Sequence, residues 1–244
     1  MEQSAQQQLL HESGNWLSRG RNRLLDSSLA RNGGGRILEI GAGAGANLRT
    51  LARYGTVDVV EVSDEFADHL ETLAWPAAVH RTPIPALRLD ERFDVIVAMD
   101  VLEHIERDEE AVRWVRDRLV PGGLFIATVP AYQWLFSDHD RAIHHFRRYT
   151  RKDLVAILDP HLDVRHATYF NSALFPLAVA SRVSWQAGRR LRGKSGTPQK
   201  QSSQAGRLDS GLGRILEWEA DRVVSGSRAP FGLSVFTIAR RPSA

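Results

Sequence analysis

The sequence predicts an α/β fold built on a doubly wound parallel sheet. Short, continuous apolar runs alternate with segments of helical periodicity, which is typical of a parallel sheet covered on both faces. A glycine-rich turn joins the first apolar run to a helix, as nucleotide-binding sheets require. The chain has 244 residues, of which 43% are hydrophobic and 25% charged, enough for one domain with an elaboration.

The composition excludes several classes of chemistry. No cysteine is present, so disulfides, thiolate metal sites and cysteine nucleophiles are excluded. No signal-peptide pattern and no run of 18 apolar residues is visible, so we expect a cytoplasmic protein without a membrane span. The net charge of +3 is small but uneven, because no acidic residue lies between Asp163 and Asp209 while eight arginines and lysines do. This stretch is either a solvated basic loop or a surface for anionic lipid, phosphate or nucleic acid.

The first half of the chain supplies most of the predicted sheet. Residues 1–35 form an N-terminal helical segment that ends at a glycine run. Strands are expected over 36–40, 57–62, 93–99 and 124–129, with a weaker one over 78–81. Helices are expected over 48–54, 66–73 and 108–119.

The second half departs from this alternation. A polar, aromatic and histidine-rich stretch covers 132–149, and a helix then starts at Thr150 with Asp153 placed for a capping box. A strand over 164–170 follows. The core domain is expected to comprise 36–170 and 229–244, with a closing strand over 231–239. Residues 171–228 form a basic insertion with helices over 173–190 and 209–224, which is a lid, a dimer contact of a homodimer, or an element on an anionic membrane surface.

The glycine-rich turn predicts a ligand site. Glu39-x-Gly41-x-Gly43-x-Gly45 lies between a strand and a helix, where glycines let a ligand approach the backbone and the helix N-terminus offers free N–H groups. Glu61 ends the second strand about 20 residues later, where an acid accepts hydrogen bonds from ribose hydroxyls. Gly41-x-Gly43-x-x-Ala46 also satisfies the dinucleotide fingerprint, so an NAD(P)-dependent oxidoreductase is an alternative.

Motifs further along favour a different cofactor. Val101-Leu102-Glu103-His104-Ile105 follows the fourth strand, and Leu119-Val120-Pro121-Gly122-Gly123 precedes the fifth. Together with the glycine turn and Phe93-Asp94-Val95-Ile96, they resemble the class I S-adenosylmethionine-dependent methyltransferases, in particular the type 11 group. The resemblance implies a Rossmann-like, seven-stranded sheet with an antiparallel last strand, and S-adenosyl-L-methionine as cofactor.

The resemblance also assigns cofactor contacts to residues of three loops: Glu39, Gly41, Ala42, Gly43, Glu61, Val62, Asp100 and Val101. Glu39, Gly41 and Gly43 would line the methionine portion, Glu61 would hold the ribose and Val62 would pack near the adenine. Asp100 and Val101 would face the sulfonium. Where the family often has an acid for the adenine amino group, this chain has Arg81-Thr82-Pro83.

The histidine-rich stretch resembles a subgroup found beside polyprenol-phosphate glycosyltransferases. Its pattern reads here as Ser137, Asp140, His145, Arg147, Arg148 and Tyr149. His145 could be a general base that Asp138 or Asp140 orients. Arg147 and Arg148 could clamp a phosphate or carboxylate of the acceptor, with Tyr149 beside them and Trp134 excluding water. The alternative is a structural network that anchors a lid, with Arg147 paired to Asp140.

His104 is either a second candidate base or a brace for its loop. No metal site is expected, because the spacing of Asp138, Asp140, His144 and His145 matches no standard site. Nucleic acid is not the favoured acceptor, because the basic region is confined to one insertion without an aromatic platform. The sequence therefore predicts a methyltransferase for a small-molecule or lipid-linked acceptor, or else a cofactor-binding scaffold without catalysis.

Overall fold

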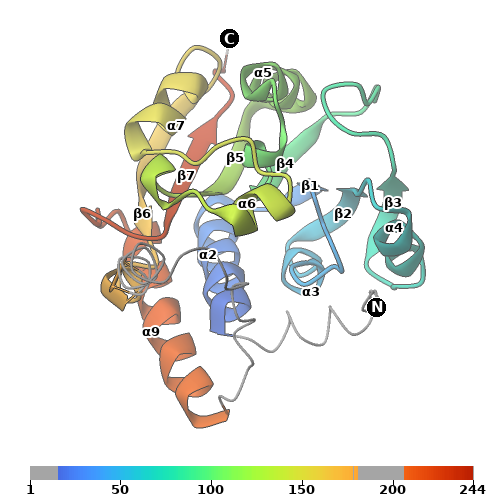
Figure 1. Cartoon of the computed structure of the whole chain (residues 1–244). Helices are drawn as coiled ribbons and strands as arrows, with labels where there is room; N and C mark the ends of the chain where they lie inside the picture. Colours follow the sequence, from blue (N-terminus) through green and yellow to red (C-terminus); the bar gives the residue numbers. More distant parts are fainter. Residues whose placement is uncertain (1–15, 178, 181–205, 244) are drawn as a thin grey trace.

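The computed structural model describes residues 16–177, 179–180 and 206–243. Its centre is a seven-stranded sheet with the order β3-β2-β1-β4-β5-β7-β6 (Figure 1). The strands are β1 (Gly35–Ile40), β2 (Gly55–Val60), β3 (Pro76–His80), β4 (Phe93–Met99), β5 (Leu119–Pro130), β6 (Asp163–Phe170) and β7 (Ser234–Arg240). β1 to β5 are parallel, and β7 runs antiparallel between β5 and β6, which confirms the predicted fold.

The two faces of the sheet carry separate apolar clusters. On one face α5 (Asp108–Arg118) and α7 (Arg151–Leu158) pack with side chains such as Leu38 and Ile96. On the other face lie α2 (Trp16–Asn32), α3 (Leu48–Leu51), α4 (Asp64–Glu71) and α9 (Gly206–Val224) (Figure 1). Neighbouring residues of one strand therefore reach opposite clusters, which is why the strands read as continuous apolar runs.

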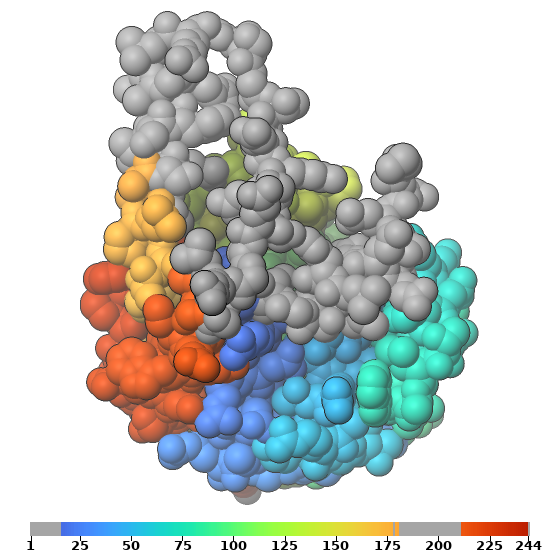
Figure 2. Space-filling view, turned by 90° about the horizontal axis from the view of Figure 1, so that it is seen from below, coloured from blue at the N-terminus to red at the C-terminus, as the bar shows by residue number. Residues whose placement is uncertain are grey.

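The N-terminal helix α2 and the late helix α9 pack side by side (Figure 2). Gly20 permits the close approach, because a Cβ there would lie 2.9 Å from Leu216 Cβ. Arg23 Nε lies 2.8 Å from Asp221 Oδ1, and Ser27 donates a hydrogen bond to the same carboxylate. The second helix of the insertion is thus part of the layer that covers the sheet.

The histidine-rich stretch contains regular structure that periodicity did not predict. A 3-10 turn, η2, covers Gln133–Leu135, and α6 covers Asp138–Ala142. Ser137 and Asp140 form a capping box at the start of α6. A helix of this length is too short to show an apolar period, so only its cap carries a signal in the sequence. The capping box predicted at Thr150 and Asp153 is confirmed at the start of α7.

Other predicted boundaries shift by a few residues. β5 begins at Leu119, before the Pro-Gly-Gly turn that we expected to precede it, because Phe93 already pairs with Leu119 across a register shift. Residues 1–15 and 181–205, which include most of the predicted basic helix and the loop after it, lie outside the described residues. Within the described part of the chain, no helix is long and apolar enough to cross a membrane.

The close contact at Gly20 gives a test of the helix pair. We expect Gly20→Leu to lower the free energy of unfolding by about 1–3 kcal/mol, because the side chain must displace Leu216 or Phe170. Gly211→Leu is the matched control, since a Cβ at that α9 position meets no described atom within 4 Å. The control should raise stability by about 0.5 kcal/mol through helix propensity. Urea denaturation measures both, and equal effects would contradict the packing.

Candidate functional site

The candidate site lies at the carboxyl ends of β1 and β4, which are adjacent strands with diverging connections. The loop after β1 turns through Gly41 and Gly43, whose φ angles are 72° and 54°. A Cβ at Gly41 would lie 2.7 Å from Val101 Cγ2, so the two loops touch there. A Cβ at Gly43 would meet no heavy atom of the described residues within 4 Å. The backbone of Gly43 is therefore open to a ligand.

Glu61 joins the loops after β1 and β2. Its Oε2 accepts a hydrogen bond of 2.7 Å from the N–H of Gly43, and its Oε1 accepts one of 2.9 Å from the N–H of Ser63. A carboxylate has about four lone-pair sites, so hydrogen-bonding capacity remains for a ligand. Val62, the next residue, is 60% exposed and presents an apolar surface beside this carboxylate.

Glu39 is a buried acid at the end of β1. Asn47 Nδ2 donates a 2.7 Å hydrogen bond to Oε1, while Oε2 has no partner among the described residues. Burial raises the pKa of Glu39 to about 8. Sequence reasoning missed Asn47; its position just before α3, within the glycine-rich turn, was the available signal.

Asp100 follows β4 with a φ of 56°, a strained conformation for a residue other than glycine. Thr128 Oγ1 donates a 3.0 Å hydrogen bond to its Oδ1, and Arg21 of α2 forms an ion pair with its carboxylate. The strain and these two partners hold the Asp100 side chain in one orientation. The role of Arg21 could not be predicted, because its contact crosses 79 residues of chain.

Glu103, His104 and His145 converge beyond Asp100. Glu103 and His104 belong to the 3-10 turn η1 (Leu102–His104), and His145 comes from the stretch after α6. The rings of His104 and His145 meet edge to face, with centroids 4.5 Å apart. Neither oxygen of the fully buried Glu103 has a hydrogen-bond partner among the described residues. Burial raises the pKa of Glu103 to about 8, and burial also lowers the pKa of both histidines.

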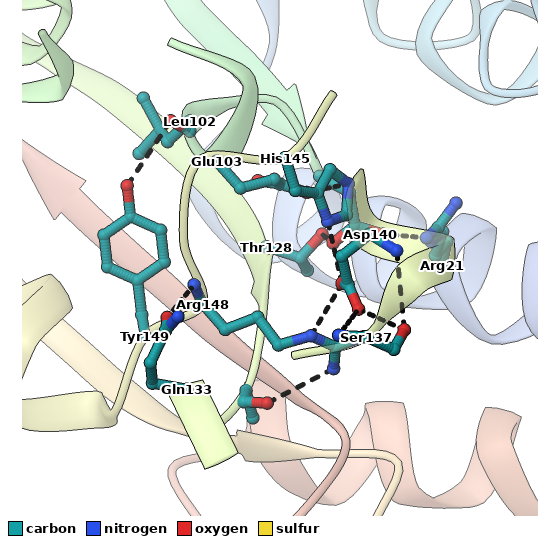
Figure 3. Close-up of polar contacts among 12 residues, drawn as sticks. Arg21, Leu102, Glu103, Thr128, Gln133, Ser137, Asp140, His145, Arg148 and Tyr149 are labelled. Carbon is teal, nitrogen blue, oxygen red and sulfur yellow. Dashed lines mark hydrogen bonds and ion pairs between the residues drawn. The ribbon is translucent and has the colours of Figure 1, made fainter. Parts of the chain in front are cut away.

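Asp140 connects this group to α6 (Figure 3). Its Oδ1 lies 3.0 Å from His145 Nδ1 and accepts a 2.7 Å hydrogen bond from Arg148 Nε, and its Oδ2 accepts one of 2.6 Å from the Ser137 hydroxyl. Burial opposes ionisation of Asp140, but hydrogen bonds from Arg148, Ser137 and His145 outweigh it and lower the pKa to about 2. Asp140 is therefore an ionised carboxylate that orients His145.

The arginine pairing differs from the alternative considered in the sequence. Arg148, rather than Arg147, binds Asp140, because the turn after α6 directs alternate side chains to opposite sides. Arg147 instead forms a 2.6 Å ion pair with Asp108, and the hydroxyl of the buried Tyr149 donates a 2.7 Å hydrogen bond to the same carboxylate. These contacts tie the stretch to α5, and the predicted acceptor contacts of these residues stay predictions.

Half-buried and exposed aromatic side chains gather beside this network. Tyr132 stacks on Tyr169 with ring centroids 5.0 Å apart and lies 5.5 Å from Phe175. Trp134, which is 55% exposed, and Phe231, which is 41% exposed, extend the group on either side. Tyr132 lies beside the network, because its neighbour in the sequence, Gln133, accepts a hydrogen bond from the backbone N–H of Arg148. An aromatic group thus adjoins the polar cluster.

The comparisons with known proteins agree on one family. A family model described as a methyltransferase domain matches residues 10–174. The chain is 35% identical over 101 residues to the ubiquinone biosynthesis O-methyltransferase of Caulobacter sp. (strain K31), a match that covers 37% of this chain and 39% of that protein. The chain thus spans about two fifths of the length of that relative.

Solved structures show the same fold. N-methyltransferase NodS from Bradyrhizobium japonicum WM9, in complex with S-adenosyl-L-homocysteine, has a TM-score of 0.57 at 20% identity, covering 98% of this chain and 100% of that one. An S-adenosylmethionine-dependent methyltransferase from Clostridium acetobutylicum ATCC 824 has a TM-score of 0.61 at 11% identity, covering 93% and 92%. At these identities the likeness establishes the fold alone.

The buried acid at the end of β1 predicts a pH-dependent stability. The pKa of Glu39 is about 8 in the folded chain, above the value of about 4.3 for an unfolded glutamate. The folded chain therefore binds more protons between these values, and its stability falls as pH rises through this window. Glu39→Gln should gain about 1–3 kcal/mol over the wild-type chain between pH 6 and pH 9.

Urea denaturation at each pH measures this difference. Glu106→Gln, at an exposed position, is the control and should follow the wild-type curve at every pH. Parallel pH curves for Glu39→Gln and the wild type would show that Glu39 is ionised throughout.

Proposed function

This chain belongs to the methyltransferase domain family, and we propose that it methylates an oxygen atom of a small-molecule or lipid-linked acceptor. The observation that carries the proposal is the set of polar groups at the carboxyl ends of β1 and β4, among them two buried acids with an unpartnered oxygen in the described part of the chain. Glu39 and the open face of Gly43 lie at the end of β1, Glu103 and His104 follow β4, and His145 reaches them from the stretch after α6.

The residues at the carboxyl ends of β1, β2 and β4 fit S-adenosylmethionine. The unpartnered Oε2 of Glu39 suits the ammonium group of the methionine portion, because a buried carboxylate gains most from an opposite charge. The open backbone at Gly43 leaves room that a side chain would fill, while Gly41 lets the turn pass close to Val101, with Ala42 between the two glycines. Glu61 retains lone pairs for ribose hydroxyls, and the exposed Val62 offers an apolar surface to an adenine ring. Asp100 and Val101 complete the site at the end of β4.

When bound, S-adenosylmethionine supplies a methyl group on a positively charged sulfur and leaves as S-adenosylhomocysteine. The residues of this chain align the methyl donor with the acceptor and place polar groups beside them. Asp100, held by Arg21 and Thr128, keeps one polar group fixed beside the predicted methyl donor. The group of Glu103, His104 and His145 favours the deprotonated form of an acceptor hydroxyl, and Asp140 positions His145 for that task.

The choice of oxygen rests on two supports. One relative is named an O-methyltransferase, although the match covers only part of each chain. The two histidines have lowered pKa values through burial, so they are neutral groups able to accept a proton or a hydrogen bond. A nitrogen acceptor is the alternative, since NodS is an N-methyltransferase with the same fold.

The acceptor is proposed to carry an apolar portion. Trp134 is exposed beside the half-buried rings around Tyr132, and this aromatic group next to the polar cluster suits an aromatic ring or an isoprenoid chain. Arg147, Arg148 and Tyr149 are proposed to act at its border, where their contacts with Asp108 and Asp140 hold the aromatic group in place. The resemblance to the subgroup beside polyprenol-phosphate glycosyltransferases favours a lipid-linked acceptor, presented at a membrane surface near the insertion.

Cofactor binding is tested by titration calorimetry with S-adenosylhomocysteine, with NADH and NADPH in parallel. We expect micromolar binding of S-adenosylhomocysteine. Glu61→Ala should weaken it about 10- to 100-fold, because a hydrogen bond to a charged group contributes about 1.5–3 kcal/mol. Glu71→Ala, at an exposed position on α4, should bind like the wild type. Binding of a nicotinamide cofactor instead would contradict the assignment.

The methylated atom is tested with trideuteromethyl S-adenosylmethionine. An extract of cells that produce the protein is incubated with the purified chain, and both the organic and the aqueous phase are analysed by tandem mass spectrometry. We expect a product with the label on oxygen, recovered in the organic phase. A label on nitrogen would contradict the proposed acceptor atom, and cofactor binding without any labelled product would favour the scaffold alternative.

A further inference from the structure

Glu103, His104 and His145 have the arrangement of a metal site. We propose that these three residues bind a divalent transition-metal cation. Each offers one ligand atom, and the three atoms lie within 4.8 Å of one another. One carboxylate with two imidazoles is a donor set that zinc uses in proteins, and imidazole also suits several other first-row divalent metals. The sequence did not predict the site, because its ligands come from two segments about 40 residues apart.

Glu103 is the strongest reason for the proposal. Its side chain is fully buried, and neither oxygen has a hydrogen-bond partner among the described residues. A buried carboxylate needs a compensating charge or several hydrogen bonds. The two nearby guanidinium groups are engaged elsewhere, Arg21 with Asp100 and Arg148 with Asp140. A cation bound at Glu103 would supply the compensation that the protein itself does not.

His145 is oriented as a metal ligand. Its Nδ1 lies 3.0 Å from Asp140 Oδ1, and this hydrogen bond leaves the Nε2 lone pair free. Nε2 lies 3.8 Å from Glu103 Oε1, which is too long for a hydrogen bond. Two ligands with bonds of about 2.0–2.1 Å to one tetrahedral ion lie about 3.3 Å apart, so a small adjustment closes the site. A carboxylate that orients a ligating histidine is a recurrent feature of such sites. Figure 3 shows His145 between Glu103 and Asp140.

His104 places the site near the surface. Its ring meets that of His145 at 82°, and the residue is exposed while Glu103 is buried. The cation would therefore be enclosed on the Glu103 side and open on the His104 side, as a site with three protein ligands is. Its use rests on the proposed function. With His145 Nε2 bound to the cation, the cation rather than His145 would favour the deprotonated acceptor, because a hydroxyl in the open position would release its proton to water more readily. Binding of the cation itself does not depend on that function.

The proposal is tested on the full chain after removal of metals with a chelator. Equilibrium dialysis against Zn²⁺, followed by elemental analysis, should give about one bound ion per chain. Glu103→Gln and His145→Ala should each weaken binding by more than about 100-fold, since the loss of an orienting group alone costs about 10- to 100-fold. Asp140→Asn should show that smaller loss. His139→Ala, an exposed histidine on the same short helix, should bind like the wild type.

Co²⁺ in place of Zn²⁺ gives a measurement that needs no variant. Its visible absorption should show a four- or five-coordinate site with nitrogen and oxygen ligands in the wild-type chain. The proposal is overturned if the wild-type chain binds no stoichiometric Zn²⁺, or if Glu103→Gln and His145→Ala bind it as the wild type does. Titration of S-adenosylhomocysteine in the presence of chelator separates this outcome from failure of the proposed function, because it tests the cofactor site without the cation.

Discussion

The position of β1 between β2 and β4 determines where the functional groups of this chain lie. β1 pairs in parallel with both neighbours, so the chain leaves its carboxyl end toward one side while β4 leads toward the other. Because the connections after β1 and β4 lead away from each other, neither of them fills the space between the ends of these two strands. Glu39 lies on one side of this space, at the end of β1, and Asp100 and the turn η1 lie on the other side, after β4. Every group proposed to act on a ligand is attached to one of these sides or packs on them.

Buried carboxylates are the main energetic cost of this arrangement. Glu39 and Glu103 are each buried with at least one oxygen unpartnered among the described residues, whereas Asp140 is buried but takes part in four hydrogen bonds. The contrast separates Asp140, whose hydrogen bonds are made within the protein, from Glu39 and Glu103, which still have an unpartnered oxygen among the described residues. Asp140 thus holds neighbouring side chains in place, whereas the two glutamates are the residues proposed to bind a ligand.

The sheet and the cofactor side could be predicted because their signals are local. A continuous apolar strand, a glycine turn and an acid about 20 residues later are contained in short windows of sequence. The acceptor side could not, because it depends on contacts between distant segments: Arg21 meets Asp100, and His145 meets Glu103. Glu103 lay inside a motif that was noted for His104, but burial without a partner is visible only in three dimensions. The short helix α6 also carried no period that a sequence could reveal.

The sheet order has a consequence for the growing chain. β6 pairs only with β7, and β7 also pairs with β5, so β7 must enter between two strands that are already synthesised. Until residues 234–240 leave the ribosome, β5 presents an unpaired edge and β6 has no neighbour. Helix α2, among the first segments made, likewise waits for α9 to cover it. The nascent chain therefore exposes the edge of β5 and the face of α2 that contacts α9 until its last helix and strand are made, and surfaces of this kind make a nascent chain prone to aggregate.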